Sequence, residues 1–453
     1  MRELVSLDWL QSGKSIPPRS QLDRIKKYQD NRKLFYGDHS EVFREQLNRI
    51  KPFLDESVVS ETYPVVFNYN RLITLKTVDL ICGEPPEITA TNGKGQETLD
   101  EIMKTISLNK IIMDVSRMGD SVVRVFKGQD GKNKTALVKP DMWYPVIDDD
   151  TGDIIYHVIV GILHDDKGRP EKLRVQIHSK GSYEQREYTY KEECVGGELS
   201  REVYRTGLSD FAIVHFPNVT TSDSMFGVDD YTPIDSIMSE LMVRVVQVNR
   251  ILDKHAAPSM QGPDTALQYN DKSKNYEVKA GNYFINDLDD GKVEYLTWDG
   301  NINAAFTMVE KLLEQLYIIS EMGGALLGAE GSAGQASSGT ALRLRMINPL
   351  VKAKRISRIV EPRLKHLISL VSEIGYRRIK EDDISIDWFD GLPDDSTEVA
   401  QTVQTWSGAT AASIRQKVSY IHSNWSDEEI DEEVERIMQE NGITVDNPDD
   451  LTT

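Results

Sequence analysis

The sequence predicts a mixed α+β protein in which a region of short strands is inserted between helical segments. Between residues 120 and 217, apolar runs of strand length are separated by Gly and Asp turns, as in an antiparallel sheet. On either side, apolar residues recur at helical spacing. The composition, 39% hydrophobic and 28% charged, is typical of a folded globular protein. A length of 453 residues favours about three domains.

Helices are expected first in the N-terminal part of the chain. Residues 22–34 and 68–83 carry helical patterns, and residues 99–118 are long enough for one or two further helices. The second pattern stops at Gly83-Glu-Pro-Pro86, because the residue before a proline is pushed out of the helical region. Residues 1–20 are interpreted as a loose arm.

Seven strands are expected in the region that follows. They cover residues 122–126, 136–138, 144–147, 154–160, 173–177, 183–190 and 211–216. The acidic segment from Asp148 to Asp153 superficially resembles a calcium loop. Such a loop needs a bidentate Glu at its twelfth position, where this chain has Ile159. The segment is therefore interpreted as a hairpin turn.

A second helical region begins at Thr232 and ends at His255. Its apolar stripe spans about seven turns and consists of Ile234, Ile237, Met238, Leu241, Val245, Val248 and Leu252. We interpret the stripe chiefly as packing, either within one chain or around a ring of subunits. Short strands at 276–278, 283–285 and 293–296 follow, and then a helix at about 301–322.

The segment from Ser338 to Lys380 is basic in an otherwise acidic chain. It holds eleven Lys or Arg residues and two acids, whereas the whole chain carries a net charge of −20. A helix that Ser338 or Thr340 could cap is expected to break or kink at Asn348-Pro349, because proline has no N–H and restricts the residue before it. A second helical stripe then continues to Gly375.

Two interpretations of these basic residues stay open. In the first, the charges pair across a subunit or domain contact with the C-terminal residues 381–453, which contain nineteen acids and three bases. In the second, Lys352, Lys354 and Arg355 project towards a polyanion. The overall acidic balance argues against a protein that grips duplex DNA, since tight binding neutralises phosphates with Lys and Arg. It is compatible with a protein that lets DNA pass.

No pattern in the chain indicates catalysis, a cofactor or a metal site. The eight histidines lack zinc-ligand spacing, and no serine lies in a Gly-x-Ser-x-Gly sequence. The Gly-rich residues 328–339 lack the Gly-Lys-Ser/Thr ending of a P-loop and are interpreted as a flexible connection. We expect neither a signal peptide nor a membrane span. Two cysteines are too few for a disulfide framework, which favours a reducing cytoplasm.

Four stretches in order give the chain a resemblance to a known family. They are Phe35–His39 with Asn68–Arg71 and Gly83–Pro86; Met118–Val125 with Pro140 and Trp143–Ile147; Ser337–Arg343; and Ile386–Asp395 with Gly408, Ser413 and Asp427–Glu435. Their order and spacing resemble the portal proteins of tailed double-stranded-DNA bacteriophages, in the branch of long-tailed phages of Gram-positive bacteria. The chain departs from the family at Thr410–Ser413 and at Trp406, which affects details of the C-terminal module.

The resemblance implies a portal fold with wing, stem, clip and crown, assembled as a ring around a central channel. The regions it implies are the wing (1–228), the first stem helix (229–255), the clip (256–337), the second stem helix (338–348), the tunnel loop (349–355), a long wing helix (356–380) and the crown (381–453). The candidates for contact with DNA in the channel are Asn348, Pro349, Lys352, Lys354 and Arg355.

The resemblance also implies a non-enzymatic function. A ring of about twelve subunits would occupy one capsid vertex and pass double-stranded DNA during packaging and ejection. The implied partners are the terminase large subunit, a head-completion or adaptor protein, the scaffold and the major capsid protein, with no membrane. Assembly would occur in the host cytoplasm, and the mature location would be the virion. A metal-dependent DNA-processing enzyme and a capsid or tail scaffold without a channel are the alternatives.

Overall fold

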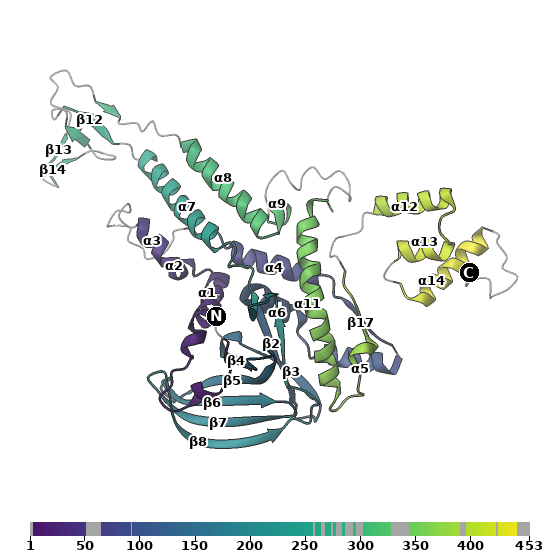
Figure 1. Ribbon diagram of the computed structural model, residues 1–453. Coiled ribbons are helices and arrows are strands. Elements are labelled where there is room, and N and C mark those ends of the chain that lie inside the picture. Colours follow the sequence, from purple (N-terminus) through teal and green to yellow (C-terminus); the bar gives the residue numbers. More distant parts are fainter. Residues whose placement is uncertain are drawn as a thin grey trace. The chain divides into compact units, whose positions relative to one another are not determined.

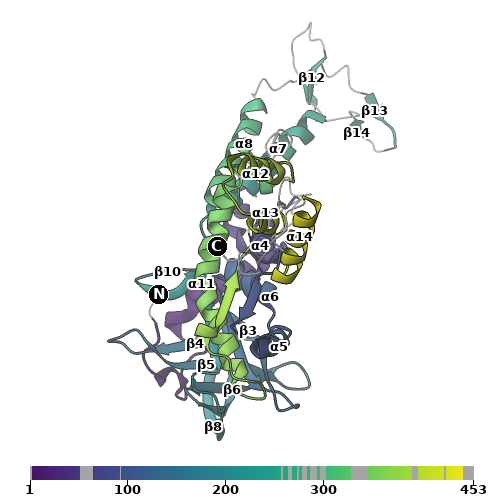
Figure 2. The same cartoon turned by 90° about the vertical axis from the view of Figure 1, so that its right-hand side faces the viewer.

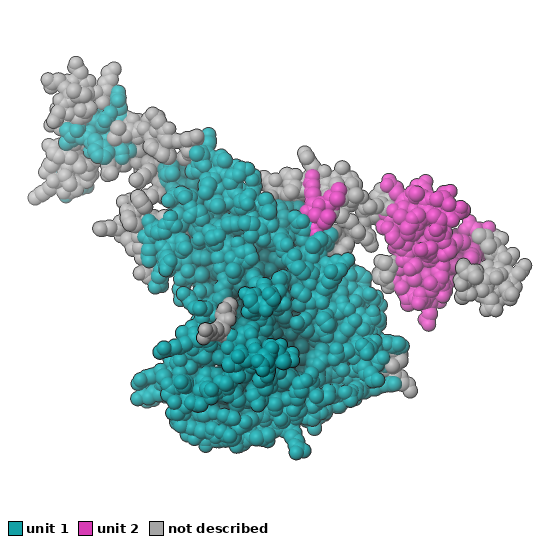
Figure 3. All heavy atoms as spheres, in the orientation of Figure 1, with its two compact units in different colours: residues 1–327, 348–391 teal, residues 328–347, 392–453 magenta. Residues whose placement is uncertain are grey.

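The computed structural model describes residues 3–50, 65–91, 93–256, 259–263, 268–272, 275–277, 283–285, 293–295, 302–327, 344–389, 396–422 and 425–441. Figure 1 labels its helices and strands along the chain. The chain divides into two compact units, which Figure 3 colours separately. Unit 1 comprises residues 1–327 and 348–391, and unit 2 comprises residues 328–347 and 392–453.

The N-terminal part of unit 1 is mostly helical. Its helices are α1 (Leu22–Tyr36), α2 (His39–Val42), α3 (Arg44–Ile50), α4 (Tyr69–Cys82), α5 (Gly93–Met103) and α6 (Leu108–Met118). Helix α1 ends at Gly37, which has a φ of 99° in the left-handed region that favours glycine. Helix α4 begins at Asn68, whose side chain accepts a hydrogen bond from the backbone N–H of Arg71. The predicted helices are confirmed, and residues 99–118 lie in two of them.

Two antiparallel sheets follow, with the strand orders β4-β5-β6-β7-β8 and β3-β2-β9. Their strands are β2 (Asp120–Lys127), β3 (Asn133–Val138), β4 (Trp143–Ile147), β5 (Ile154–His164), β6 (Pro170–Ser179), β7 (Ser182–Lys191), β8 (Cys194–Arg205) and β9 (Ile213–Pro217). All seven predicted strands are confirmed. The eighth, β8, was not predicted, because residues 197–205 are exposed and no buried face imposes an apolar alternation on them.

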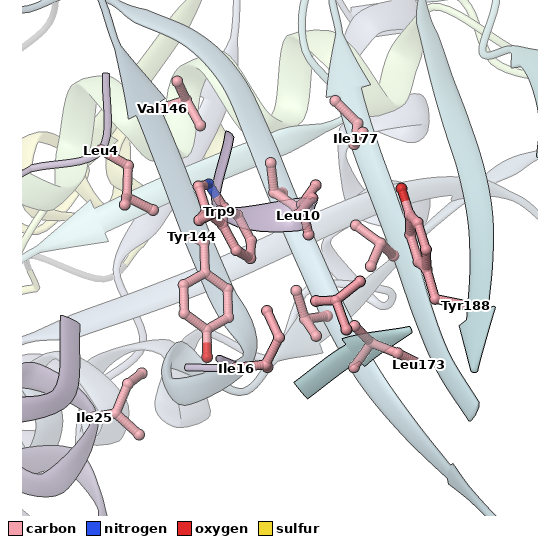
Figure 4. Packing of buried hydrophobic residues seen from close by; sticks show 14 of the residues in the cluster. Leu4, Trp9, Leu10, Ile16, Ile25, Tyr144, Val146, Leu173, Ile177 and Tyr188 are labelled. Carbon is pink, nitrogen blue, oxygen red and sulfur yellow. The ribbon is translucent and has the colours of Figure 1, made fainter. Parts of the chain in front are cut away.

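The N-terminal arm is part of the core. Figure 4 shows Leu4, Trp9, Leu10 and Ile16 against the strands of the five-stranded sheet, and all four side chains are buried. The backbone N–H of Gly13 donates to the carbonyl of Val195 at 2.8 Å, so the arm also lines the start of β8. The interpretation of residues 1–20 as a loose arm was wrong, because the apolar residues of the arm cover an apolar face of the sheet and remove it from water.

Two histidines are buried in the five-stranded sheet, at facing positions of β5 and β6. The Nδ1 atom of His157 accepts a hydrogen bond from Trp143 Nε1 at 3.0 Å, which requires an unprotonated nitrogen. Neither ring nitrogen of His178 has a hydrogen-bond partner, and its ring stacks on Tyr183. Burial lowers the pKa of both histidines to about 3, from the ordinary 6.5.

We expect these two histidines to make the fold sensitive to acid. Below pH 6.5 they bind protons in the unfolded chain but not in the folded one, so stability is complete above that pH and declines as the pH falls towards 3. Each histidine contributes a slope of up to about 1.4 kcal/mol per pH unit. Urea unfolding at pH 7.5 and 5 measures the slope, and His178→Phe should remove its share while keeping the stacking on Tyr183. An unchanged slope would contradict the assignment.

The chain then forms a pair of helices. After β10 (Val219–Thr221) and β11 (Ser224–Val228) come α7 (Asp235–Ala256), the short strands β12 (Met260–Gly262), β13 (Gln268–Asn270), β14 (Asn275–Glu277), β15 (Tyr283–Ile285) and β16 (Glu294–Tyr295), and α8 (Ile302–Ile319) with α9 (Gly323–Leu326). Helix α8 returns beside α7, as Figures 1 and 2 show from two directions. The strands between them form two small sheets with the orders β15-β12-β16 and β13-β14.

The basic segment forms one long helix, α11 (Ile347–Ser372), with Pro362 inside it. The predicted break at Asn348-Pro349 was wrong. A turn lies earlier, at Met346, and Pro349 belongs to the first turn of α11, where a missing N–H costs no intrahelical hydrogen bond. The tunnel-loop residues 349–355 are therefore helical. Residues 338–343 of the expected second stem helix lie outside the described residues.

The expected start of the crown at residue 381 also differs from the structure. Strand β17 (Ile384–Asp387) pairs antiparallel with β1 (Glu87–Ala90) and so belongs to unit 1. Unit 2 contains α12 (Ser396–Ala409), α13 (Ile414–Ile421) and α14 (Asp427–Glu440). Its small core is formed by Val418, Ile430 and Val434. Ser426 and Glu429 form a capping box at the start of α14.

Candidate functional site

The start of α7 and the end of α8, which we call the base of the helix pair, are held together by apolar packing within one chain. Ile234, Met238 and Leu241 of the predicted stripe are fully buried, and Leu316 of α8 is fully buried as well. The other members differ in their environment. Val248 is buried, Ile237 and Val245 are half-buried, and Leu252 is 45% exposed. The sequence did not single out Met242, Val243 and Val246, which are also buried.

Large apolar side chains of α8 point away from this packing. Ile318 is 63% exposed and Ile319 41%, and Phe306 and Met308 are exposed as well. Groups of exposed apolar side chains commonly mark surfaces that another protein covers. The helix pair therefore buries some of its large apolar side chains within its own chain and leaves others exposed.

A buried ion pair lies at the base of the helix pair. Lys352, in the second turn of α11, is 4% exposed, and its Nζ lies 3.0 Å from Oδ1 of Asp230, which precedes α7. The same ammonium group donates to the carbonyl of Ser320, just after α8, at 3.1 Å. Asp230 also accepts hydrogen bonds from Ser116 of α6 and from Asn218.

A second ion pair lies one helical turn further along α11. The guanidinium group of Arg355 forms a two-pronged contact with the carboxylate of Glu321, and the Nη1–Oε1 distance is 3.2 Å. This contact raises the pKa of Arg355. We call Asp230, Ser320, Glu321, Lys352 and Arg355 the junction, because they join the start of α7, the end of α8 and α11.

The structure separates the five predicted channel residues. Asn348 and Pro349 lie in the first turn of α11, and Pro349 is buried. Lys352 and Arg355 are engaged in the junction. The prediction that Lys352 projects towards a polyanion was wrong for this chain, since its ammonium group is buried against a carboxylate. Lys354 is exposed and has no ion pair with any described residue.

The alternative interpretation, pairing with the acidic C-terminal residues across a subunit or domain contact, stays a prediction, and the described ion pairs of the segment are instead with acids of unit 1. The partners of Lys352, Arg355, Lys365 and Arg378 are Asp230, Glu321, Glu361 and Glu373, all within unit 1. Asp230 and Glu321 were missed in the sequence. Asp229-Asp230 before a helix predicts a capping position, but no local signal shows a pairing with a lysine 122 residues later.

The remaining candidates have simpler explanations. Asp148 Oδ1 accepts hydrogen bonds from the backbone N–H groups of Asp150 and Thr151, so residues 148–153 form the predicted turn between β4 and β5. Among the described residues, no group of three or more His, Cys, Asp or Glu could hold a metal ion. No helix in the described part of the chain is long and apolar enough to cross a membrane.

A hollow of about 500 Å³ lies beside α11, between α4 and the residues after β17. Lys354, Arg358 and Glu361 line it from α11, and Trp388 and Phe389 line it from the other side. Trp388 Nε1 donates to Glu361 at 3.3 Å, and Glu361 also pairs with Lys365. The carboxylate in the hollow is thus occupied, whereas Lys354 and Arg358 have no acidic partner among the residues described.

Exposed large apolar side chains on a helix pair are typical of a structural subunit that packs against other proteins. The family model described as "Phage portal protein, SPP1 Gp6-like" matches residues 19–442. The chain belongs to this family of phage portal proteins. No curated protein matches the sequence.

Several solved structures resemble the chain at low sequence identity. A chain in the virion of a native gene transfer agent particle is 11% identical, with a TM-score of 0.48, and the match covers 90% of this chain and 96% of that one. A chain in the neck of the native particle, computed with C12 symmetry, is 11% identical, with a TM-score of 0.42 and coverages of 81% and 90%. A chain in the neck of the empty particle, computed with C6 symmetry, is 12% identical, with a TM-score of 0.48 and coverages of 90% and 95%.

Family membership sets the role and the location of the protein. It is the portal vertex protein of a phage-type particle, and it forms the channel through which double-stranded DNA is packaged and ejected. Its place is the virion. The protein is a structural component of an assembly.

Proposed function

We propose that this chain assembles into a closed ring of about twelve subunits, in which α7 and α8 are the two stem helices. The observation that carries this proposal is the exposure of large apolar side chains on α8, including Ile318 and Ile319. In a ring with rotational symmetry, these side chains of each subunit are covered by a different surface of its neighbour, so they do not stay exposed.

We propose boundaries that differ from those implied by the sequence resemblance. We propose that residues 1–228 form the wing with α11, and that α7 remains the first stem helix. Helix α8 takes the place of residues 338–348 as the second stem helix, because it lies along α7. The clip is then confined to the short strands between α7 and α8, and the crown begins near residue 392, where unit 2 resumes.

The proposed partners follow from this arrangement. The clip docks the terminase large subunit during packaging and then a head-completion or adaptor protein, while the wing contacts the scaffold and the major capsid protein during assembly in the host cytoplasm. The ring performs no catalysis itself. The alternatives, a metal-dependent DNA-processing enzyme and a scaffold without a channel, predict metal-dependent cleavage of plasmid DNA and a solid assembly, respectively.

The charge of the chain suits a conduit for DNA. A net charge of −20 per subunit, repeated around a ring, repels the phosphate backbone and prevents the salt-dependent binding that would slow its movement. A few exposed cations can still touch the backbone without reading its sequence. On α11, Lys354 and Arg358 are the candidates, since both are exposed and neither is paired with a described acid.

Replacing these two cations tests their proposed role. We expect the double variant Lys354→Ala with Arg358→Ala to form normal rings but to package DNA several-fold more slowly, because two backbone contacts are lost. Lys365→Ala is the matched control, since this lysine lies on the same helix but is already paired with Glu361. Normal packaging by the double variant would exclude a role for this face of α11 in DNA contact.

Electron microscopy of the purified protein tests the proposed function most directly. Class averages viewed along the symmetry axis, with the mass from light scattering, should show a ring of about twelve subunits with an opening wide enough for a DNA duplex. A closed oligomer without an axial opening would reject the proposal and favour the scaffold alternative.

A further inference from the structure

We infer that the junction is a mechanical joint that makes the two stem helices and α11 move together, with Lys352 and Asp230 as its positioning residues. This inference rests on the proposed function for the identity of α7 and α8 as stem helices. It assigns Lys352 a role away from the DNA, although Lys352 belongs to the basic segment.

The Lys352–Asp230 ion pair is buried and has most of its polar atoms satisfied. Burying two charges removes them from water, and this loss is recovered only when the geometry is good and the remaining polar atoms are satisfied. Here both side chains are almost fully buried, and the carboxylate of Asp230 has three donors, namely Lys352, Asn218 and Ser116. A buried ion pair does not by itself show that the fold gains stability. It does fix the positions of its two side chains, because either charge would be strongly destabilised if it were buried without the other.

Three helices meet at the ammonium group of Lys352. Lys352 Nζ contacts a carboxylate before α7 and a backbone carbonyl after α8, at 3.0 Å and 3.1 Å. The carbonyl of Ser320 lies at the negative end of the α8 dipole, where a cation is favoured. One ammonium group of α11 therefore holds both helices of the pair at their common base.

The second ion pair, between Arg355 and Glu321, holds the turn that follows α8. Glu321 has a φ of 60°, in the left-handed region that residues other than glycine rarely adopt. Its two-pronged contact with Arg355 holds the turn after α8 in this conformation. Lys352 and Arg355 are three residues apart and so lie on one face of α11. Because Lys352 and Arg355 both contact the residues that follow α8, the end of α8 cannot rotate about the Lys352 contact alone.

The consequence is a rigid connection between parts that are far apart in the sequence. A displacement of α7 or α8, for example when a partner binds the strands between them, is transmitted to the first turns of α11 rather than absorbed at a hinge. Lys354 lies between the two junction residues of α11, so its position follows that of the helix pair. A contiguous network of this kind can carry the coupling, and a measured change at both of its ends demonstrates it.

The matched neutral pair, Asp230→Asn with Lys352→Met, tests this inference in the full-length chain. It removes both charges together, so no unpaired charge stays buried and the variant is expected to fold. Hydrogen exchange is measured at the end of α8 and in the first turns of α11, with the amides of β6 as the internal reference. Genome packaging is measured with phage that carry the same variant.

We expect exchange to rise about ten-fold at the end of α8 and the start of α11, with β6 unchanged, while rings keep their subunit number and packaging falls. Unchanged exchange at these sites would overturn the joint. Faster exchange with normal packaging would overturn its role in function. Exchange is readable whether or not the protein forms a ring, so failure of the proposed function is distinguished from failure of the joint. If the neutral pair does not fold, Arg355→Gln gives the same readout at the second contact, with Lys365→Gln as the control, since Lys365 lies on the same helix but outside the junction.

Discussion

Gly227→Ala is expected to prevent unit 1 from folding normally. Gly119 and Gly227 pack backbone against backbone, where α6 ends and β11 passes it. A Cβ at Gly227 would overlap the carbonyl oxygen of Gly119 and lie 2.5 Å from the backbone nitrogen of Asn218. The hydrogen bond from Asn218 N to Gly119 O, at 2.7 Å, occupies the same space. Neither backbone can move aside without separating β11 from α6.

The expected loss is about 3 kcal/mol or more, because a backbone has less freedom to yield than a side chain. Asp230 follows β11 by two residues, so the junction would be displaced as well. Soluble yield and thermal unfolding measure the effect. Gly197→Ala is the matched control, since a Cβ there meets no atom within 4 Å, and its change should stay within about 0.5 kcal/mol. Equal melting temperatures for the two variants would contradict the prediction.

Ile318→Glu is expected to abolish ring assembly and leave the subunit folded. Ile318 is the most exposed of the large apolar side chains on α8, so a charge there removes little packing within the chain. In a ring, the same carboxylate would be buried against a neighbour without a partner, which costs several kcal/mol for each contact. The interface repeats at every subunit, so the effect on assembly is multiplied around the ring.

Light scattering and circular dichroism together distinguish the two parts of this prediction. The mass should fall to that of the subunit, while the helical signal is retained. Val203→Glu introduces the same charge at an exposed apolar residue of β8, outside the proposed stem, and should assemble normally. A ring formed by Ile318→Glu would show that the apolar face of α8 does not form the contact between subunits.

The elements with a regular apolar period were predictable from the sequence, and those without one were not. The stripe of α7 and the seven strands are examples of the first kind, because burial on one face imposes a period on the residues. Strand β8 belongs to the second kind, since residues 197–205 are exposed and free of that constraint. The arm was missed because Trp9, Leu10 and Ile16 are too few to show a period, although they are buried.

The candidate site shows a different limit. A lysine in a basic segment is most simply predicted to be exposed, and the sequence gives no sign that Asp230 lies beside Lys352. That proximity depends on how α7, α8 and α11 meet, which is a property of the whole unit. Pro349 was predicted to end a helix. Proline is also compatible with the first turn of a helix, and Pro349 lies in the first turn of α11. The family resemblance supplied the function, but the contacts of its residues required the structure.

The burial of the arm has a consequence for the order of events during synthesis. Trp9 and Leu10 leave the ribosome early, but the strands that cover them, from β4 to β8, end only at residue 205. At about 5–20 residues per second, the arm waits for roughly ten seconds or more before its partners exist. During that time its apolar side chains are exposed to chaperones or to the arms of other nascent chains. The apolar residues of the arm are thus made well before the sheet that buries them.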